Sequence, residues 1–563
     1  MKAKLRQRVL YLIFMFLLIG MSQKLMAADK EALRIGMIQE SDTLNPLLSS
    51  NSAGRYILGF LHRPFVSLDN DKEFKPLIVK KIPNLKDKSL KVFTTNKVKK
   101  MKATWEFVDG LRWNDNVPVT CKDLHFSWQV GLNPNVTLAS KESFEKIEKI
   151  EWEEKTPTKC NVTYKEAHWN FFLNMPDLLP AHLEESIYNK YSSSKEGYER
   201  NSNYQREPTK KGLWFGPYII SEVKLGSHLI LTANENFYGK KPKIKNIIIR
   251  YITSSASLES NLRSDTINHI ARLGLSLDQA LIFEKKIQAE KLPFEVKFQD
   301  GMTYAHININ LTHSILKDQG VRQALSYGLN KQEIVDSLFE GKATIAYHLI
   351  SPQDPLYTMD PTTINKYESD KKKARKILDD IGWKVGSDSF RYKEGQKLRF
   401  TLVAAGGAKI NETIQTLIQS QWKEIGVDLK IKSETGRTLF SETLPKQKFD
   451  MALVSWASFP QESVSSVLNS KNIPSDSNMW AGQNYAGYKN ERVDQLTDHY
   501  GSEFDFEKRK KNMREVMSLY TKEVPAIPLY FRKENSVVPV GMKNFELTGH
   551  LFFESLKSEN WEL

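Results

Sequence analysis

Helical spacing, a glycine and a strand-like segment follow one another repeatedly in the second half of this chain. Apolar residues recur at helical spacing in segments that end at Gly341, Gly382 and Gly426. A glycine just past a helix is a common C-terminal stop, because glycine adopts the left-handed conformation without strain. The strand-like segment 427–431 directly follows the last of these glycines. Helices that alternate with short apolar strands predict an α/β architecture.

The length of the chain predicts more than one lobe. Single hydrophobic cores stop growing at about 250–300 residues, and this chain has 563. Its composition is 40% hydrophobic and 26% charged, which excludes disordered, collagenous and disulfide-dense classes. The formal charge is +14, but five of the basic residues lie in the first 28 positions and the remaining excess is spread over the chain. We therefore expect no nucleic-acid partner.

The first 28 residues have the features of a secretory signal peptide. Four basic residues precede an apolar run over 9–19, and small residues stand at Ala27 and Ala28. The run is too short for a membrane-spanning helix, which needs about 20 apolar residues. No cysteine follows it, which argues against a lipid anchor. We expect residues 1–28 to be removed near these alanines and the remaining chain to be exported.

Export changes what the two cysteines of the chain imply. Cys121 and Cys160 would meet an oxidising compartment, in which a disulfide persists. A pair of buried thiols is the alternative, because the sequence does not fix the distance between their Cα atoms. Both alternatives fit the sequence.

Motifs of enzymatic chemistry are missing from the sequence. It contains no Gly-x-Ser-x-Gly elbow, His-Glu-x-x-His pair, phosphate-binding loop or dinucleotide-binding glycine pattern. His306 and His313 flank a predicted strand without a third ligand nearby, so we expect packing or surface roles rather than a metal site. The Lys-rich stretch 80–102 predicts a solvated hairpin or loop. These observations favour a protein that is not an enzyme and holds no cofactor.

Aromatic residues gather between positions 456 and 488, where they fit either a pocket lining or a hydrophobic core. Any single aromatic residue is more often part of the core. As a group they are candidate ligand contacts, and they comprise Trp456, Phe459, Trp480, Tyr485 and Tyr488, together with Asn484.

Ordered motifs carry a resemblance that covers nearly the whole exported chain. In chain order they lie at Leu33–Pro46, Leu111–Asp123, Gly216–Tyr218 with Asn234, Phe237 and Tyr238 after it, Asp318–Ala324, and Pro525–Tyr530. With these motifs the chain resembles the extracellular solute-binding proteins of family 5, the receptor subunits of ABC importers for peptides, nickel and related solutes. No single motif carries the resemblance, which rests on their order and spacing.

This resemblance implies an α/β, two-lobe periplasmic binding protein of the type II kind, whose lobes close about a hinge over a ligand cleft. The extra sub-domain of the large peptide-binding members would lie at about 65–200, inside a first lobe that spans 29–301. Residues 302–523 would form the second lobe, and residues 524–563 would return to the first. The ligand would select the closed state by contacting both lobes.

The same resemblance marks candidate substrate contacts. They are Tyr304, Trp456, Ser458, Phe459, Glu462, Asn484 and Tyr485. In the peptide-binding members, a tryptophan of the second lobe is followed three residues later by an aspartate that pairs with the α-ammonium group of the ligand. Here Phe459 takes that position after Trp456, and the nearest carboxylate is Glu462.

A buried ammonium group without a partner is unfavourable, so we expect no free α-ammonium at Phe459 itself. The ligand would then be N-blocked, non-peptidic or bound in another orientation. Glu462 either takes over the role of the aspartate or is solvated.

The resemblance implies a monomeric periplasmic receptor that captures a peptide or peptide-like solute and delivers it to ABC permease subunits in the inner membrane. A non-peptide solute, such as a nickel complex, an oligosaccharide or an opine, is the alternative ligand. A ligand-presenting sensor or a chaperone-like binding protein is the alternative to transport. A secreted hydrolase would need a nucleophile or paired carboxylates in the cleft, which no motif indicates.

Overall fold

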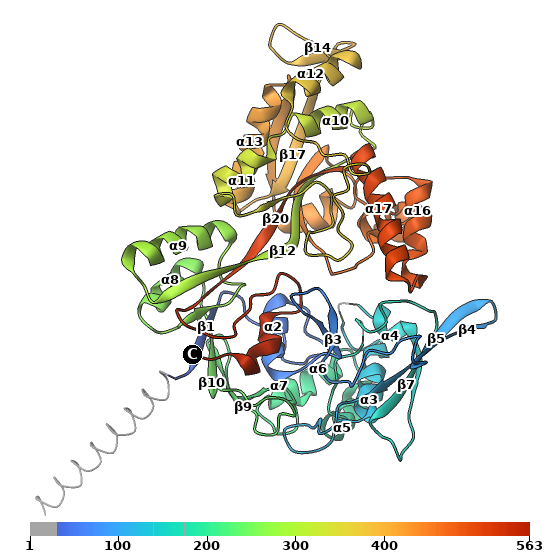
Figure 1. Ribbon diagram of the computed structural model, residues 1–563, viewed down its shortest axis with the longest axis vertical. Coiled ribbons are helices and arrows are strands. Elements are labelled where there is room, and N and C mark those ends of the chain that lie inside the picture. The colour runs from blue at the N-terminus through green and yellow to red at the C-terminus, as the bar shows by residue number, and fades with distance from the viewer. Residues whose placement is uncertain (1–30, 139, 174) are drawn as a thin grey trace, which may run out of the picture.

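One eleven-stranded mixed sheet runs through both halves of the molecule (Figure 1). The computed structural model describes residues 31–138, 140–173 and 175–563, so the expected signal peptide lies outside the described residues. The strand order is β18-β17-β19-β12-β20-β11-β1-β10-β9-β8, with β13 paired to β20. These strands are β1 (Leu33–Met37), β8 (Tyr218–Lys224), β9 (His228–Ala233), β10 (Asn246–Tyr251), β11 (His269–Ile270), β12 (Phe294–Ile309), β13 (Thr344–Ile345), β17 (Arg399–Ala405), β18 (Asp428–Glu434), β19 (Met451–Ala457) and β20 (Ala526–Pro539).

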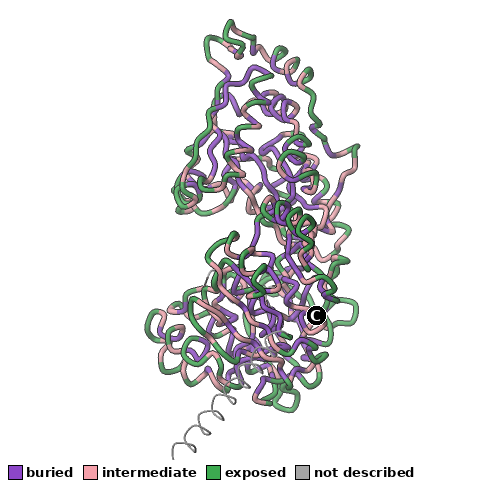
Figure 2. The backbone as a smooth tube through the Cα atoms, turned by 90° about the vertical axis from the view of Figure 1, so that its left-hand side faces the viewer, coloured by how far each residue is buried: buried purple, intermediate pink, exposed green. Residues whose placement is uncertain are grey.

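Two lobes form around the two ends of this sheet, as expected. We call lobe I the part built around β1 and β8 to β11, and lobe II the part built around β17 to β19. Figure 2 shows buried backbone in both the upper and the lower half of the molecule, and separate buried apolar clusters surround β1 and β17. The α/β, two-lobe prediction is confirmed.

The long antiparallel strands β12 and β20 connect the lobes. Residues 294–300 of β12 pair with the end of β20, and residues 304–308 pair with its beginning. The register shifts between Asp300 and Tyr304, a break that bends a strand pair. Ile527 and Tyr530 pack in the core of lobe II. The first half of β20 is therefore buried with lobe II, and its second half pairs with β11 of lobe I.

A four-stranded antiparallel sheet with its own apolar core lies within the range expected for the inserted sub-domain. Its order is β4-β5-β7-β6, and its core extends from Phe65 to Leu178 with Phe215 beside it. The shorter strands of the molecule are β2 (Val66–Leu68), β3 (Phe74–Pro76), β4 (Leu90–Thr95), β5 (Val98–Glu106), β6 (Ile147–Glu151), β7 (Lys159–Tyr164), β14 (Lys384–Val385), β15 (Arg391–Lys393) and β16 (Gln396–Lys397). The strands β4 and β5 form the exposed hairpin expected for the Lys-rich stretch.

Cys121 and Cys160 form a disulfide, which decides between the two alternatives. Cys121 begins helix α3 and Cys160 lies on β7. Their Cα atoms are 5.5 Å apart, within the range that a disulfide requires. The bond therefore ties α3 to the sheet of the sub-domain.

Helices precede and follow the crossing strand β12 in the chain. Those before β12 are α2 (Ser52–Leu61), α3 (Cys121–Leu132), α4 (Glu142–Lys146), α5 (Ala181–Tyr191), α6 (Gly197–Asn201), α7 (Asn203–Arg206), α8 (Ser255–Arg263) and α9 (Leu277–Glu290). Those of lobe II are α10 (Gln319–Tyr327), α11 (Lys331–Phe339), α12 (Lys371–Asp380), α13 (Lys409–Lys423), α14 (Gly436–Thr438), α15 (Ser465–Leu468), α16 (Glu491–Asp498) and α17 (Phe506–Glu523), with short 3-10 or π turns η1 (Leu439–Thr443), η2 (Ser470–Asn472), η3 (Asp476–Asn478) and η4 (Tyr500–Ser502).

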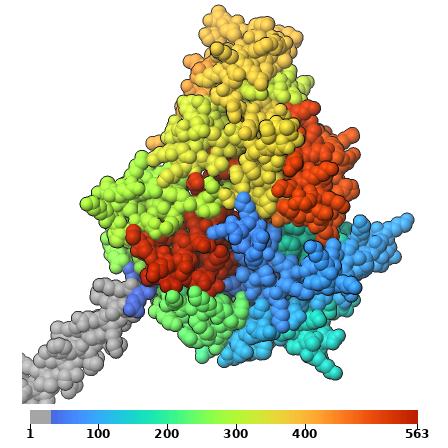
Figure 3. Space-filling view, in the orientation of Figure 1, coloured from blue at the N-terminus to red at the C-terminus, as the bar shows by residue number. Residues whose placement is uncertain are grey.

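The C-terminal residues pack on lobe I. The 3-10 segment η5 (Glu554–Asn560) lies against α2, and Figure 3 shows the C-terminal segment in dark red at the surface where the two lobes meet. Gly59 of α2 approaches Ser555 so closely that a Cβ would clash with its side chain. Among the described residues, no helix combines the length and the apolar character that crossing a bilayer requires.

Candidate functional site

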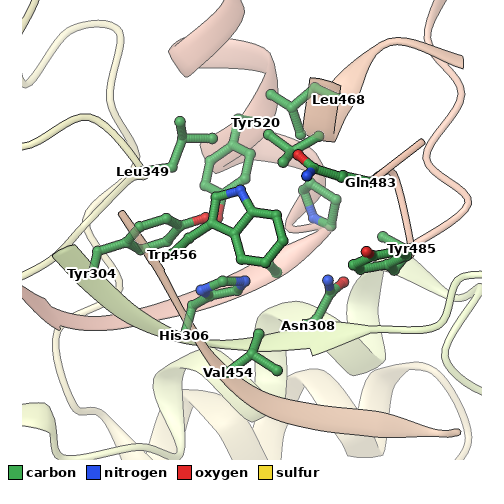
Figure 4. Close-up of a pocket in the computed structure, with 14 residues that line it drawn as sticks. Tyr304, His306, Asn308, Leu349, Val454, Trp456, Leu468, Gln483, Tyr485 and Tyr520 are labelled. Carbon is green, nitrogen blue, oxygen red and sulfur yellow. The ribbon is translucent and has the colours of Figure 1, made fainter. Parts of the chain in front are cut away.

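Two neighbouring strands place aromatic side chains on one wall of a cavity in lobe II. Tyr304 of β12 lies opposite Trp456 of β19, and His306 lies opposite Val454. Side chains two residues apart in a strand point to the same face, so Tyr304 and His306 stack with their ring centres 4.4 Å apart. Figure 4 shows Trp456 among these rings.

The smaller cavity at this wall has a volume of only about 30 Å³. Tyr520 of α17 and Tyr485 complete its aromatic lining (Figure 4). Burial lowers the pKa of His306 to about 3 and raises the pKa of Tyr304. Both rings are therefore neutral at pH 7, and this cavity offers aromatic surface and hydrogen bonds rather than charge.

A larger cavity of about 360 Å³ lies directly beside it. The two cavities share lining residues, among them Tyr304, Leu349 and Trp456. Such a volume is in the range of small-molecule sites, which span about 300–1,000 Å³. The larger cavity is further lined by Ile350, Asp354, Ala457, Ser458, Phe459, Glu462, Ser463, Val464, Ser466, Val467 and Gln483.

Two carboxylates make the larger cavity electronegative. Asp354 is buried and accepts hydrogen bonds of 2.8 Å from the backbone N–H groups of Leu356 and Gln461. Burial raises its pKa to about 6. Glu462 accepts a 2.8 Å hydrogen bond from the backbone N–H of Phe459. Loss of hydration raises the pKa of Glu462 as well. Among the described residues that line this cavity there is no lysine, arginine or histidine.

Most of the candidate residues converge on these cavities. Tyr304, Trp456, Ser458, Phe459 and Glu462 line the larger cavity, and Tyr485 lines the smaller one. Glu462 therefore lines a cavity and is hydrogen-bonded to its own loop, while its side chain is also exposed to solvent.

Asn484 lines neither cavity. Its side chain is fully buried, and its amide group donates to the carbonyl groups of Asn469 and Tyr488 at 3.1 and 2.8 Å. Its Oδ1 accepts from the N–H of Tyr488. Asn484 thus holds the loop that presents Tyr485.

The sequence did not predict Asp354 as a cavity residue, and it predicted only a packing or surface role for His306. Asp354 lies in an irregular segment after β13 without any motif, so the sequence carries no local indication of it. The alternation of Tyr304, His306 and Asn308 along one face of β12 was the pattern that could have placed His306 on a cavity wall.

Lobe I contacts lobe II beside the larger cavity. The Arg509 guanidinium of α17 lies 3.9 Å from the ring centre of Trp169. The backbone N–H of Trp169 donates to the carbonyl of Gly501 at 2.9 Å. Arg509 also donates to Oε1 of Gln461 at 3.0 Å, and the N–H of Gln461 donates to Asp354. A continuous chain of contacts therefore runs from lobe I to a carboxylate of the cavity.

A second crossing point lies at the turn between β2 and β3. Lys72 of lobe I donates through Nζ to the carbonyl of Pro352 at 2.8 Å. Its positive charge partly offsets the effect of burial on the pKa of Asp354. Phe459 of lobe II also reaches across, with its ring 5.4 Å from that of Phe552.

Residues 91–475 match the model of a family described as bacterial extracellular solute-binding proteins, family 5 Middle. The chain belongs to this family. As a family 5 solute-binding protein it is 25% identical over 519 residues to the oligopeptide-binding protein AppA of Bacillus subtilis, covering 91% of this chain and 88% of that protein. The resemblance predicted from the motifs is confirmed.

Solved structures share the fold of this solute-binding protein. The oligopeptide-binding protein of Thermus thermophilus, complexed with a pentapeptide, has a TM-score of 0.69 at 22% identity and covers 94% of this chain and 96% of its own. NikZ of Campylobacter jejuni, in complex with Ni(L-His), has a TM-score of 0.70 at 22% identity and covers 95% and 100%. The Bacillus subtilis and Thermus thermophilus proteins are both described as oligopeptide-binding proteins.

Proposed function

We propose that this solute-binding protein is the periplasmic receptor of an ABC importer, which captures a peptide or peptide-like solute and delivers it to permease subunits in the inner membrane. The family and the oligopeptide-binding relative support this role. The cavities beside the contacts between the lobes support capture by lobe closure, with no covalent step and no cofactor. The receptor acts as a monomer in this proposal.

The pair of carboxylates in the larger cavity is the observation that supports the proposed class of solute. Asp354 and Glu462 face it without a basic side chain in the described lining. A partly buried carboxylate favours a nearby positive charge, because the pair offsets the loss of hydration. The solute therefore carries an amine, which lies against these carboxylates and not against the ring of Phe459.

Replacing Glu462 by glutamine is expected to weaken binding of a free-amine peptide by about 10- to 100-fold, since a charge-assisted hydrogen bond contributes roughly 1.5–3 kcal/mol. A thermal-shift panel of dipeptides to octapeptides, oligosaccharides and nickel–histidine supplies the ligand, and calorimetry then compares the best peptide with its N-acetylated twin. The wild type should prefer the free amine, and Glu462→Gln should lose most of that preference.

Glu491→Gln is the matched control, because Glu491 is exposed on α16 and lines neither cavity. It should bind like the wild type. Equal affinity of the wild type for the peptide and its acetylated twin would overturn the amine assignment. Stabilisation only by an oligosaccharide or by nickel–histidine would show that the solute is not a peptide.

The affinity for the free-amine peptide should fall as the pH is lowered from 7 to 5. The pKa of Asp354 is raised to about 6 and that of Glu462 is raised too, so both lose their charge at a higher pH than exposed carboxylates do. The positive amine then loses its partners below about pH 6. Calorimetry across this range checks the trend, and the N-acetylated twin should show a much flatter profile. A flat profile for the free amine would contradict the role of the carboxylates.

A further inference from the structure

A further cavity lies mainly in lobe I, beside the cavities described above. Its volume is about 520 Å³, and it lies between α2, the loop before it and the C-terminal segment. Phe459 of lobe II closes one end, and the same residue lines the larger cavity of lobe II. The two cavities therefore adjoin at the ring of Phe459.

Apolar side chains line much of the lobe I cavity, and several of them are incompletely buried. Leu551 is 45% exposed, and Leu48, Phe552 and Leu556 are half-buried. Exposed apolar groups that gather at one concave surface indicate a binding site, because covering them removes apolar area from water. The fold itself leaves this surface without a covering segment among the described residues.

The charges at the cavity compensate one another. Arg55 and Asp177 form an ion pair of 2.7 Å. Burial lowers the pKa of His62 to about 4, so its ring is neutral at pH 7. In contrast to the two carboxylates in lobe II, the described lining here holds no net charge that would select an ionic group.

We propose that the lobe I cavity binds the apolar part of the solute whose amine lies in the lobe II cavity. This inference rests on the proposed function and specifies its substrate class. The solute is a cationic amphiphile, such as a free-amine peptide or a peptide-like amine with bulky aliphatic or aromatic groups beyond the amine. It passes the ring of Phe459, which packs against Phe552 at the junction of the two cavities.

The probe for this site is N-phenyl-1-naphthylamine, an uncharged apolar dye whose fluorescence rises in apolar surroundings. Ser143 lines the cavity at a half-buried position of α4, so Ser143→Trp should fill part of it and weaken dye binding by about tenfold or more. Leu551→Ser removes an exposed apolar contact and should weaken the dye by about fivefold.

Leu225→Ser is the matched control for Leu551→Ser. Leu225 is 84% exposed in the turn between β8 and β9, and it does not line the cavity. It should leave dye affinity within about twofold of the wild type. Circular dichroism and melting temperature establish that each variant is folded, and Leu551→Ser keeps the test valid if Ser143→Trp does not fold.

Peptides then test whether both cavities serve one solute. A free-amine tetrapeptide with leucine and phenylalanine side chains should displace the dye, and triglycine should not. Glu462→Gln should weaken binding of the tetrapeptide but leave dye affinity unchanged. The two measurements therefore distinguish a wrong amine assignment from a wrong assignment of the apolar site. Dye binding that is insensitive to both Ser143→Trp and Leu551→Ser, or a tetrapeptide that binds without displacing the dye, would overturn the proposal.

Discussion

Replacing Cys121 and Cys160 together by alanine is expected to lower the free energy of unfolding by about 4 kcal/mol. The disulfide joins residues 39 positions apart, and in the chain-entropy model a loop of this length restricts the unfolded chain by that amount. Both cysteines are fully buried, so the bond joins α3 to β7 within the core of the sub-domain. The sub-domain should therefore unfold first in the variant.

Urea unfolding followed by tryptophan fluorescence measures this loss. Dithiothreitol should destabilise the wild type by a similar amount and leave the stability of the double alanine variant unchanged. This comparison distinguishes the effect of losing the disulfide from the effect of losing side-chain packing. Two free thiols in protein recovered from the periplasm, counted in denaturant without reductant, would contradict the disulfide. So would a loss of less than about 1 kcal/mol on reduction.

Exchanging Trp169 for leucine is expected to weaken binding of the best peptide ligand by about 10- to 30-fold. Trp169 holds the Arg509 guanidinium across the lobe boundary, and a desolvated cation–π contact contributes roughly 2 kcal/mol. If the contact exists only when the lobes are closed, its loss reduces the closed population and the apparent affinity by the same factor.

A double-mutant cycle with Arg509→Met tests whether this contact between the lobes stabilises the closed state. Trp169→Leu and Arg509→Met should be strongly non-additive in ligand affinity, because each removes the same contact. Arg514→Met is the control, since Arg514 lies exposed on the same helix. Small-angle scattering of the ligand-saturated protein should show a larger radius of gyration in either variant than in the wild type. Additive effects on ligand affinity, together with an unchanged radius of gyration, would show that the contact between Trp169 and Arg509 does not stabilise the closed state.

Local patterns in the sequence predicted the α/β fold well. Gly341, Gly382 and Gly426 all adopt positive φ, from 75° to 91°, at the helix ends where the pattern placed them. Such stops are encoded within a few residues, so they are visible without tertiary information.

The family motifs also predicted the fold, and the structure shows why they are structural. Arg322 of α10 donates to the carbonyl groups of Glu523 and Val524, which ties α10 to the end of α17. Asn114 accepts hydrogen bonds from the N–H groups of Gly212 and Trp214. These side chains hold segments together and do not line the cavities of lobe II.

The site was only partly predictable, because its parts meet through tertiary structure. Trp456 and Phe459 were found through the motif, but Asp354 reaches the same cavity from a distant irregular segment. Trp169 and Arg509 are separated by more than half of the chain and meet only when the lobes are in contact. No periodicity or spacing encodes such encounters.

Native mass spectrometry of protein purified from the periplasm tests the central claim most directly. The wild type should carry one small solute that is released on unfolding, contains a basic amine and an apolar group, and disappears in Trp456→Ala, because Trp456 lines both cavities of lobe II. A bound solute that persists at equal occupancy in Trp456→Ala, or a wild type that carries no solute and gains none from the peptide panel, would contradict the account.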